Sequence, residues 1–309
     1  MKKMRESASS FVKINKNVFL LLIVFLLVPK IIASEKSNCL LPVQEFHRDD
    51  KSYNNFTIDM NKYIQGITEK EFKLKLIKNG FVVLLNAIPS PDIDNMRSLL
   101  DQTYEKAQND HSLNDDERRN ISNSHITENV FRKYNPGNSL FNVFNNKLKN
   151  LGNYFFSCDF RFNEGTHTRR VKPLQLSDLK YFQFPMGIHI DAMYHNPREF
   201  VLNFWTPLDD CGKDKPTLRT FVSNVDDTFA LMQFDIRTLT FNALTYKQVE
   251  EGTASFLQEL PSYYFVVNKG DIVVISNWTF HSGYANENMQ YPRWSMELRI
   301  SGNKFWYTK

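Results

Sequence analysis

The sequence predicts a mainly β fold with flanking helices, in which an all-β sandwich or barrel follows a helical N-terminal part. From about residue 150 onward, short apolar and aromatic runs such as "FVLNFWTPL", "SYYFVV" and "DIVVISNWTF" alternate with Gly, Pro, Asp and Asn. Runs of this length with such turn residues are typical of short strands. The chain has 309 residues, of which 42% are hydrophobic, so it has enough apolar material for one large core.

The first 34 residues are predicted to be a targeting segment. Basic residues precede the apolar run "VFLLLIVFLLV" (18–28) and small residues follow it at 33–34, as in a secretory signal peptide. An uncleaved signal anchor is the alternative, because Ile31 and Ile32 lengthen a run that is shorter than the about 20 residues of a full span. A cytosolic protein with a misread start is the third reading. We expect the secretory route or export, with membrane attachment only through an uncleaved anchor.

Residues 35–65 are polar and irregular, so we expect a linker there and one catalytic-size domain over 66–309. The domain begins with the helical stretch "TEKEFKLKLIKNG" (68–80). Thr68 is a suitable N-cap, and Gly80 is a suitable left-handed stop.

The buried strand "FVVLL" (81–85) is expected next, because it is a continuous β-branched and apolar run. A second helix is expected over 90–108, where Pro91 stands at the first helical position and apolar residues recur at helical spacing. The polar stretch 109–126 is expected to be a surface loop or a lid.

The net charge of +4 is small for this length, and the domain has no run of Lys and Arg. These two features argue against a nucleic-acid partner. The three cysteines allow at most one internal disulfide. Glycosylation sequons that begin at Asn55, Asn120 and Asn277 fit a secretory route.

Two polar side chains interrupt the apolar stretch "FPMGIHIDAMYHNPREFVLNFWTPLDD" (184–210). On an extended strand, His189 and Asp191 would point to the same face, because side chains two apart do so. A buried carboxylate without a partner costs several kcal/mol, so we expect a cation beside it. One His and one carboxylate are two of the three ligands in the 2-His-1-carboxylate site of non-haem Fe(II).

A third ligand is available from a distant strand in "KGDIVVISNWTFHSG", which delivers His281. Arg293 and Ser295 follow on one face of the next extended run. A guanidinium and a hydroxyl opposite a ferrous site can hold the far end of a dicarboxylate. Arg299 is an alternative anchor, since it has the same strand parity as Arg293.

Four motifs together, "HID", "TPLDDCG", "KGDIVVISNWTFHSG" and "YPRWSMELR", resemble the phytanoyl-CoA dioxygenase family of Fe(II)/2-oxoglutarate oxygenases. The earlier stretch "NGFVVLLNAIPSPDIDNMRSLL" resembles the N-terminal strand and helix of that family, so the similarity covers about residues 68–302. The resemblance implies a double-stranded β-helix core, which is a jelly-roll and cupin-like architecture. It also implies Fe(II), 2-oxoglutarate and O2 as reactants, with ascorbate as an optional reductant.

The resemblance assigns roles to six residues. The implied iron ligands are His189, Asp191 and His281, and the implied 2-oxoglutarate-binding residues are Arg293, Ser295 and Trp205. The implied reaction decarboxylates 2-oxoglutarate to succinate and CO2 and hydroxylates a C–H bond of a small-molecule or lipid-like substrate.

Asp191 favours hydroxylation over halogenation, because halogenating relatives lack the carboxylate. The chain departs from the family after "PLDDCG", where "KDKPTLRTFVSNV" replaces the usual Gly-Pro-Leu and Pro-Gly-Ser-His stretches, so no substrate carries over. Two alternatives stay open: a catalytically silent jelly-roll binding protein and a membrane-anchored interaction protein. The polar surroundings of His125, His167 and the pair Arg169–Arg170 predict solvated surface positions.

Overall fold

The computed structural model describes residues 43–157, 160–163, 166–172, 189–194, 199–225 and 260–302. All of them belong to one compact unit. The predicted targeting segment, 1–34, and the start of the predicted linker, 35–42, lie outside the described residues. Within the described ranges, no helix combines the length and the apolar character that a membrane span requires.

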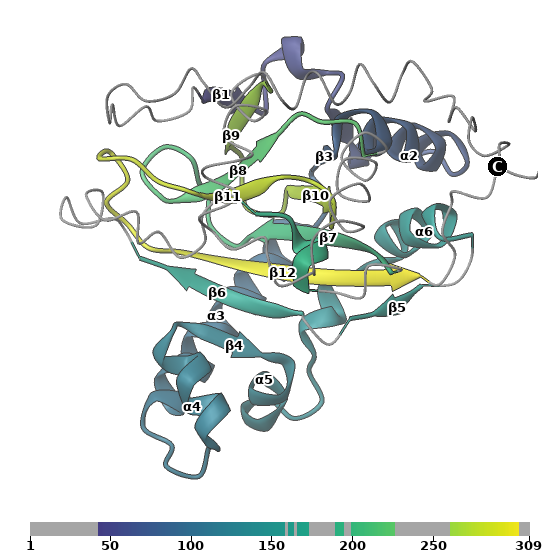
Figure 1. Cartoon of the computed structure of the whole chain (residues 1–309). Helices are drawn as coiled ribbons and strands as arrows, with labels where there is room; N and C mark the ends of the chain where they lie inside the picture. Colours follow the sequence, from purple (N-terminus) through teal and green to yellow (C-terminus); the bar gives the residue numbers. More distant parts are fainter. Residues whose placement is uncertain are drawn as a thin grey trace, which may run out of the picture. The chain divides into compact units, whose positions relative to one another are not determined.

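The strands of the described residues form two β-sheets (Figure 1). The smaller sheet has four strands in the order β1 (Gln44–His47), β9 (Ser262–Val266), β8 (Thr217–Phe221) and β11 (His281–Tyr284). The larger sheet has the order β2 (Thr57–Asp59), β3 (Phe81–Leu85), β10 (Ile272–Ser276), β7 (Phe200–Pro207), β12 (Arg293–Gly302), β6 (His167–Val171) and β4 (His125–Thr127), and β5 (Arg161–Phe162) pairs with β12.

Five α-helices in the described ranges make the fold mixed α/β, so the prediction of a mainly β chain is only partly confirmed. They are α2 (Ile67–Asn79), α3 (Ser90–Gln108), α4 (Asp115–Ser122), α5 (Glu128–Tyr134) and α6 (Asn146–Phe155). Short 3-10 turns are η2 (Lys51–Tyr53), η3 (Met60–Lys62), η4 (Leu140–Val143) and η5 (Asp191–Tyr194).

The helix predicted over 90–108 has these bounds as α3, and the strand predicted over 81–85 is β3. The end of α2 is also as predicted, because Gly80 adopts a left-handed conformation with φ of 79°. Its start differs, since the N-cap is Gly66, two residues before the predicted Thr68. The Thr68 hydroxyl instead accepts a hydrogen bond from the Ile64 amide.

Two segments expected to be irregular contain regular structure. The stretch 109–126 includes α4, which begins with reciprocal bonds between Asn114 and Glu117, so it is not simply a surface loop. Within 43–65, β1 and β2 pair with strands of the two sheets. Phe46 in β1 is fully buried and stacks on Tyr53. Neither segment has a hydrophobic period long enough to reveal an element of three to eight residues.

The central strands of the large sheet are buried on both faces. In β3, Phe81 and Val83 join a cluster with side chains of the small sheet. Their neighbours Val82 and Leu84 join the cluster that the helices cover. Burial on both faces explains why these strands read as continuous apolar runs. The face toward the small sheet also carries Trp205 and the polar side chains of β12 that line a pocket.

Candidate functional site

Backbone pairing brings the two predicted histidine ligands together. The amide of His189 donates to the carbonyl of His281 and the reverse bond also forms, both at 2.9 Å. The two imidazole rings have centroids 4.2 Å apart and are tilted by 49°. An isolated antiparallel bridge thus joins residues that are far apart in the sequence.

Asp191 joins the histidines by a different geometry from the one predicted. It does not continue an extended strand but begins the 3-10 turn η5. The amide of the next residue, Ala192, donates to the carbonyl of Asn277 at 2.7 Å, which ties the turn to the segment before β11. The turn places Asp191 Oδ1 3.5 Å from His189 Nε2 and 3.6 Å from His281 Nε2.

These three residues form a cluster suited to a metal ion. One ligand atom from each lies within 4.8 Å of the others, and all three side chains are buried. Two imidazole nitrogens and one carboxylate oxygen match the donor set of non-haem Fe(II) centres. The side chains therefore fit the group that the sequence implies.

The protonation of the cluster also suits a metal. His281 Nδ1 donates to the Thr279 carbonyl at 2.9 Å, so Nε2 carries the lone pair that faces Asp191. Burial, and then the charge of His189, lower the pKa of His281 to about 4, so its imidazole is neutral near pH 7. Burial alone would raise the pKa of Asp191, but Arg299 and the two histidines hold it well below its usual range.

The second oxygen of Asp191 contacts other residues. Oδ2 lies 3.4 Å from Arg299 Nη2 and 3.4 Å from Asn203 Nδ2. The same Arg299 nitrogen donates to Glu297 Oε2 at 2.9 Å. Arg299 therefore contacts two carboxylates close to the metal cluster.

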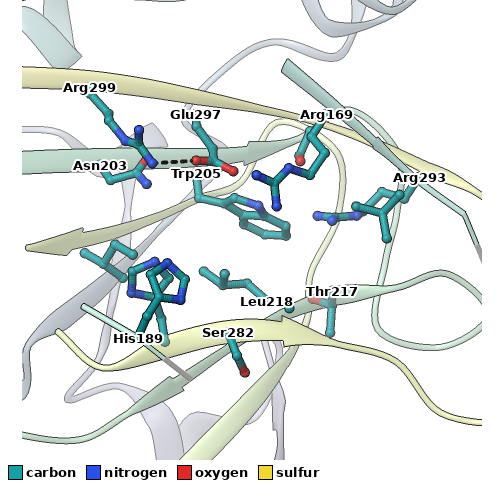
Figure 2. Close-up of a pocket in the computed structure, with 15 residues that line it drawn as sticks. Arg169, His189, Asn203, Trp205, Thr217, Leu218, Ser282, Arg293, Glu297 and Arg299 are labelled. Atoms are coloured by element: carbon teal, nitrogen blue, oxygen red, sulfur yellow. Dashed lines mark hydrogen bonds and ion pairs between the residues drawn. The ribbon is translucent and has the colours of Figure 1, made fainter. Parts of the chain in front are cut away.

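A pocket beside the histidines is lined by alternate residues of β12 (Figure 2). Arg293, Ser295, Glu297 and Arg299 face it, because residues two apart share a face of a strand. Figure 2 shows Arg299 on the His189 side of Trp205 and Arg293 on the far side. The two arginines between which the sequence leaves the choice open thus lie at different ends of one pocket.

Arg293 has the surroundings of an anion-binding residue. It is 4% exposed, and its guanidinium carbon lies 4.8 Å from the centre of a Trp205 ring. Within the described part of the chain, its Nε and Nη1 and the Ser295 hydroxyl have no hydrogen-bond partner. Burial lowers the pKa of Arg293 to about 10, so the group stays charged at neutral pH. A buried charged group whose donors have no hydrogen-bond partner is costly, which favours an anionic ligand here.

Arg169 was expected on a wet surface, and that prediction is wrong. It lines the pocket from β6 and is directly opposite Ser295 in the strand register. His167 is also largely buried, with its Nε2 3.4 Å from Glu297 Oε2, and its ring stacks on His125. His167, Arg169 and Val171 are two residues apart, so on a strand their side chains share one face with the apolar Val171. This spacing is the signal in the sequence that could have placed them on the inner face.

No family model and no curated protein matches the sequence. Solved structures do match. SnoK, a non-haem α-ketoglutarate-dependent carbocyclase from nogalamycin biosynthesis, has a TM-score of 0.53 at 12% identity over 75% of this chain and 83% of that one. The chain shares its fold with SnoK.

Two further structures are similar. EvdMO1 has a TM-score of 0.50 at 11% identity, and the match covers 76% of this chain and 50% of that one. EvdO2 from Micromonospora carbonacea var. aurantiaca, complexed with 2-oxoglutarate, has a TM-score of 0.46 at 16% identity over 78% of this chain and 91% of that one. Identities this low establish the fold alone. The chemistry therefore depends on the site residues of this chain.

Proposed function

We propose that the chain is a non-haem Fe(II)- and 2-oxoglutarate-dependent dioxygenase that hydroxylates a C–H bond of a small-molecule or lipid-like substrate. The observation that carries the proposal is the buried cluster of His189, Asp191 and His281, whose ligand atoms lie within 4.8 Å of one another. The two histidines line a pocket that also contains a buried arginine, Arg293. We further propose a double-stranded β-helix core and kinship with the phytanoyl-CoA dioxygenase family, which the quoted motifs and the fold shared with SnoK support.

The protein ligands would be His189 Nε2, Asp191 Oδ1 and His281 Nε2. These three protein atoms would hold Fe(II) and would leave room beside it for the keto-acid end of 2-oxoglutarate and for O2. When bound, Fe(II) and 2-oxoglutarate supply the activation of O2 and the oxidising power for a C–H bond, with release of succinate and CO2. Asp191 supplies the carboxylate that halogenating relatives lack, which favours hydroxylation.

Arg293 and Ser295 are suited to bind the distal carboxylate of 2-oxoglutarate. A guanidinium can donate two parallel bonds to a carboxylate, and the serine hydroxyl can donate a third. Trp205 forms the wall on which the Arg293 guanidinium packs, so it restricts the directions in which the arginine donates. Burial of these residues keeps water from competing for the same bonds.

We also propose that residues 1–34 direct the chain into the secretory route, either as a cleaved signal peptide or as an anchor. The basic, apolar and small-residue regions in sequence order support this. N-terminal sequencing of the protein secreted by its own host cells would test it, and a mature chain that still begins at Met1 in the cytosol would contradict it.

Succinate formation tests the proposed activity. The purified chain, supplied with Fe(II), ascorbate, O2 and 2-oxoglutarate, is expected to release succinate slowly on its own and faster with its substrate. The His281→Ala variant should release none while it melts cooperatively, as the unaltered protein does. A chain that forms no succinate with any extract of secreted metabolites or lipids would instead be a silent binding protein. Mass gains of one oxygen in the same extracts would identify the substrate.

A further inference from the structure

The two pocket arginines of β12 have different partners, although both lie on one face of the strand. We infer that Arg299, together with Asn203, is a positioning residue for the metal ligand Asp191, while Arg293 alone of the two serves the co-substrate. The inference rests on the proposed function and assigns separate roles to residues that are equivalent in the sequence pattern.

The geometry around Asp191 separates its two oxygens. Oδ1 faces the imidazoles, at 3.5 Å from His189 Nε2 and 3.6 Å from His281 Nε2. Oδ2 faces Arg299 Nη2 and Asn203 Nδ2, each at 3.4 Å. Arg299 and Asn203 are direct partners in the register of β12 and β7, so two neighbouring strands present one donor each to the same oxygen.

Charge matching indicates that Arg299 is already engaged. Its guanidinium contacts Asp191 and Glu297, and all three side chains are largely buried. A third carboxylate, from the co-substrate, would add negative charge to a guanidinium that already contacts two. Arg293 differs in its direct contacts, because its Nε and Nη1 have no hydrogen-bond partner among the described residues. The nearby Arg169 adds positive charge beside it, while Glu297 and Asp209 act on it in the other direction.

Holding Oδ2 has a consequence for coordination. Two imidazoles and a single carboxylate oxygen would leave three of six positions at a ferrous ion, enough for the keto-acid and O2. If both oxygens of Asp191 were ligands, only two positions would remain. Arg299 and Asn203 therefore keep Asp191 in the single-oxygen mode that the proposed reaction requires.

Titration with Mn(II), followed by electron paramagnetic resonance of the free ion, tests the inference without turnover. Three variants remove or alter the contacts: Asn203→Leu, which is close in volume; Glu297→Gln with Arg299→Gln, which preserves net charge; and Arg299→Lys, which keeps the charge but not the planar fork. Arg293→Leu is the matched control from the same strand.

We expect Asn203→Leu and the double glutamine variant to weaken Mn(II) binding about 10–100-fold, as loss of an outer hydrogen-bond partner does at other metal sites. The Mn(II) affinity of Arg299→Lys should lie between the affinities of these variants and that of the unaltered chain. Arg293→Leu should leave the Mn(II) dissociation constant within about twofold and instead abolish saturable binding of 2-oxoglutarate to the Mn(II)-loaded protein, since it removes the charged hydrogen bonds to the distal carboxylate.

Unchanged Mn(II) affinity in Asn203→Leu and in the double variant would overturn the inference, and so would weaker Mn(II) binding in Arg293→Leu. Tighter Mn(II) binding in Arg299→Lys would also overturn it. Thermal melts verify that each variant is folded. If the double variant does not fold, Asn203→Leu and Arg299→Lys decide. An unaltered chain that binds no Mn(II) contradicts the proposed function itself, which is a separate outcome.

Discussion

His281 Nδ1 donates to the carbonyl oxygen of Thr279 at 2.9 Å, and this bond determines which nitrogen of the imidazole faces the metal cluster. Thr279 is itself held, because its hydroxyl donates to the Gly80 carbonyl and its amide donates to the Ser276 carbonyl at 3.0 Å. The turn between β10 and β11 is therefore anchored to the large sheet, and it orients the His281 ring. An imidazole oriented in this way loses little freedom when a metal binds.

Loss of a protein ligand is expected to remove metal binding. His281→Ala and His189→Ala should each raise the Mn(II) dissociation constant, because a coordinate bond is lost. The rise should exceed the roughly 10–100-fold expected when a hydrogen-bond partner of a ligand is lost. The Mn(II) titration described above measures this. His111→Ala is the control, because that histidine is exposed and lies outside the cluster. Comparable Mn(II) affinity in the control and the ligand variants would show that the ion binds elsewhere.

Ser295→Ala should raise the KM for 2-oxoglutarate with little change in kcat. A hydrogen bond to a charged group contributes about 1.5–3 kcal/mol, which corresponds to a rise of about 10-fold or more. Initial rates of succinate release give both constants. Ser282→Ala is the matched control, since Ser282 lines the same pocket from β11 on the opposite sheet. An equal rise in both variants would contradict a specific role for Ser295.

Arg293→Leu should not lower the stability of the ligand-free protein, and a small increase is expected. The residue is buried, and replacing a buried charge by a hydrophobic side chain is often neutral or stabilising. The unaltered protein loaded with Mn(II) should gain about 2.7 kcal/mol from 2-oxoglutarate at 100 times its dissociation constant, and the variant should gain none. Urea denaturation with and without 2-oxoglutarate measures both effects. A strong loss of stability in the ligand-free variant would mean that Arg293 has a structural role.

The stability of the protein should fall in acid partly through His125. Burial, and then the charge of Arg169, lower the pKa of His125 to about 3 in the folded protein, whereas an unfolded histidine has a pKa of about 6.5. Between these values the unfolded chain binds more protons, so the free energy of unfolding decreases as the pH falls from 6.5 toward 3. From pH 7 to pH 4.5 this loss is about 2.5 kcal/mol.

His125→Gln should reduce that acid-induced loss, because glutamine does not titrate. Urea midpoints of both proteins at pH 7 and pH 4.5 provide the comparison. The loss of ring stacking on His167 affects the variant at both pH values and cancels in the difference. Identical pH dependence in the two proteins would exclude His125 as a contributor.

Several features of the fold could be predicted because they depend on local sequence. The continuous apolar run of β3 and the helical spacing of apolar residues in α3 are local patterns, and both stretches form the predicted elements. Only the cap of α3 differs, because Pro89 is the N-cap and Pro91 is the second helical residue instead of the first. The short strands β1, β2 and β4 were not predictable, because they are stabilised by pairing with strands far away in the chain. The helix α4 does have a local signal, the capping box of Asn114 and Glu117, which the polarity of the stretch obscured. The glycosylation sequon at Asn277 is a second case in which local sequence does not reveal the burial of a side chain. The sequon suggests an exposed acceptor, but the side chain is buried and bonds to Glu199 and Val201.

The sequence by itself determined the residue types and the order of the candidate site: a His and an Asp two apart, a distant His, and an arginine-serine pair after it. Only the tertiary structure decided that these side chains converge, that η5 rather than a strand presents Asp191, and that Arg299 contacts the carboxylates of Asp191 and Glu297. The physical reason is that strand parity assigns a side chain to a face but not to its neighbours. Those neighbours come from strands far away in the chain, and their charges determine what each arginine binds.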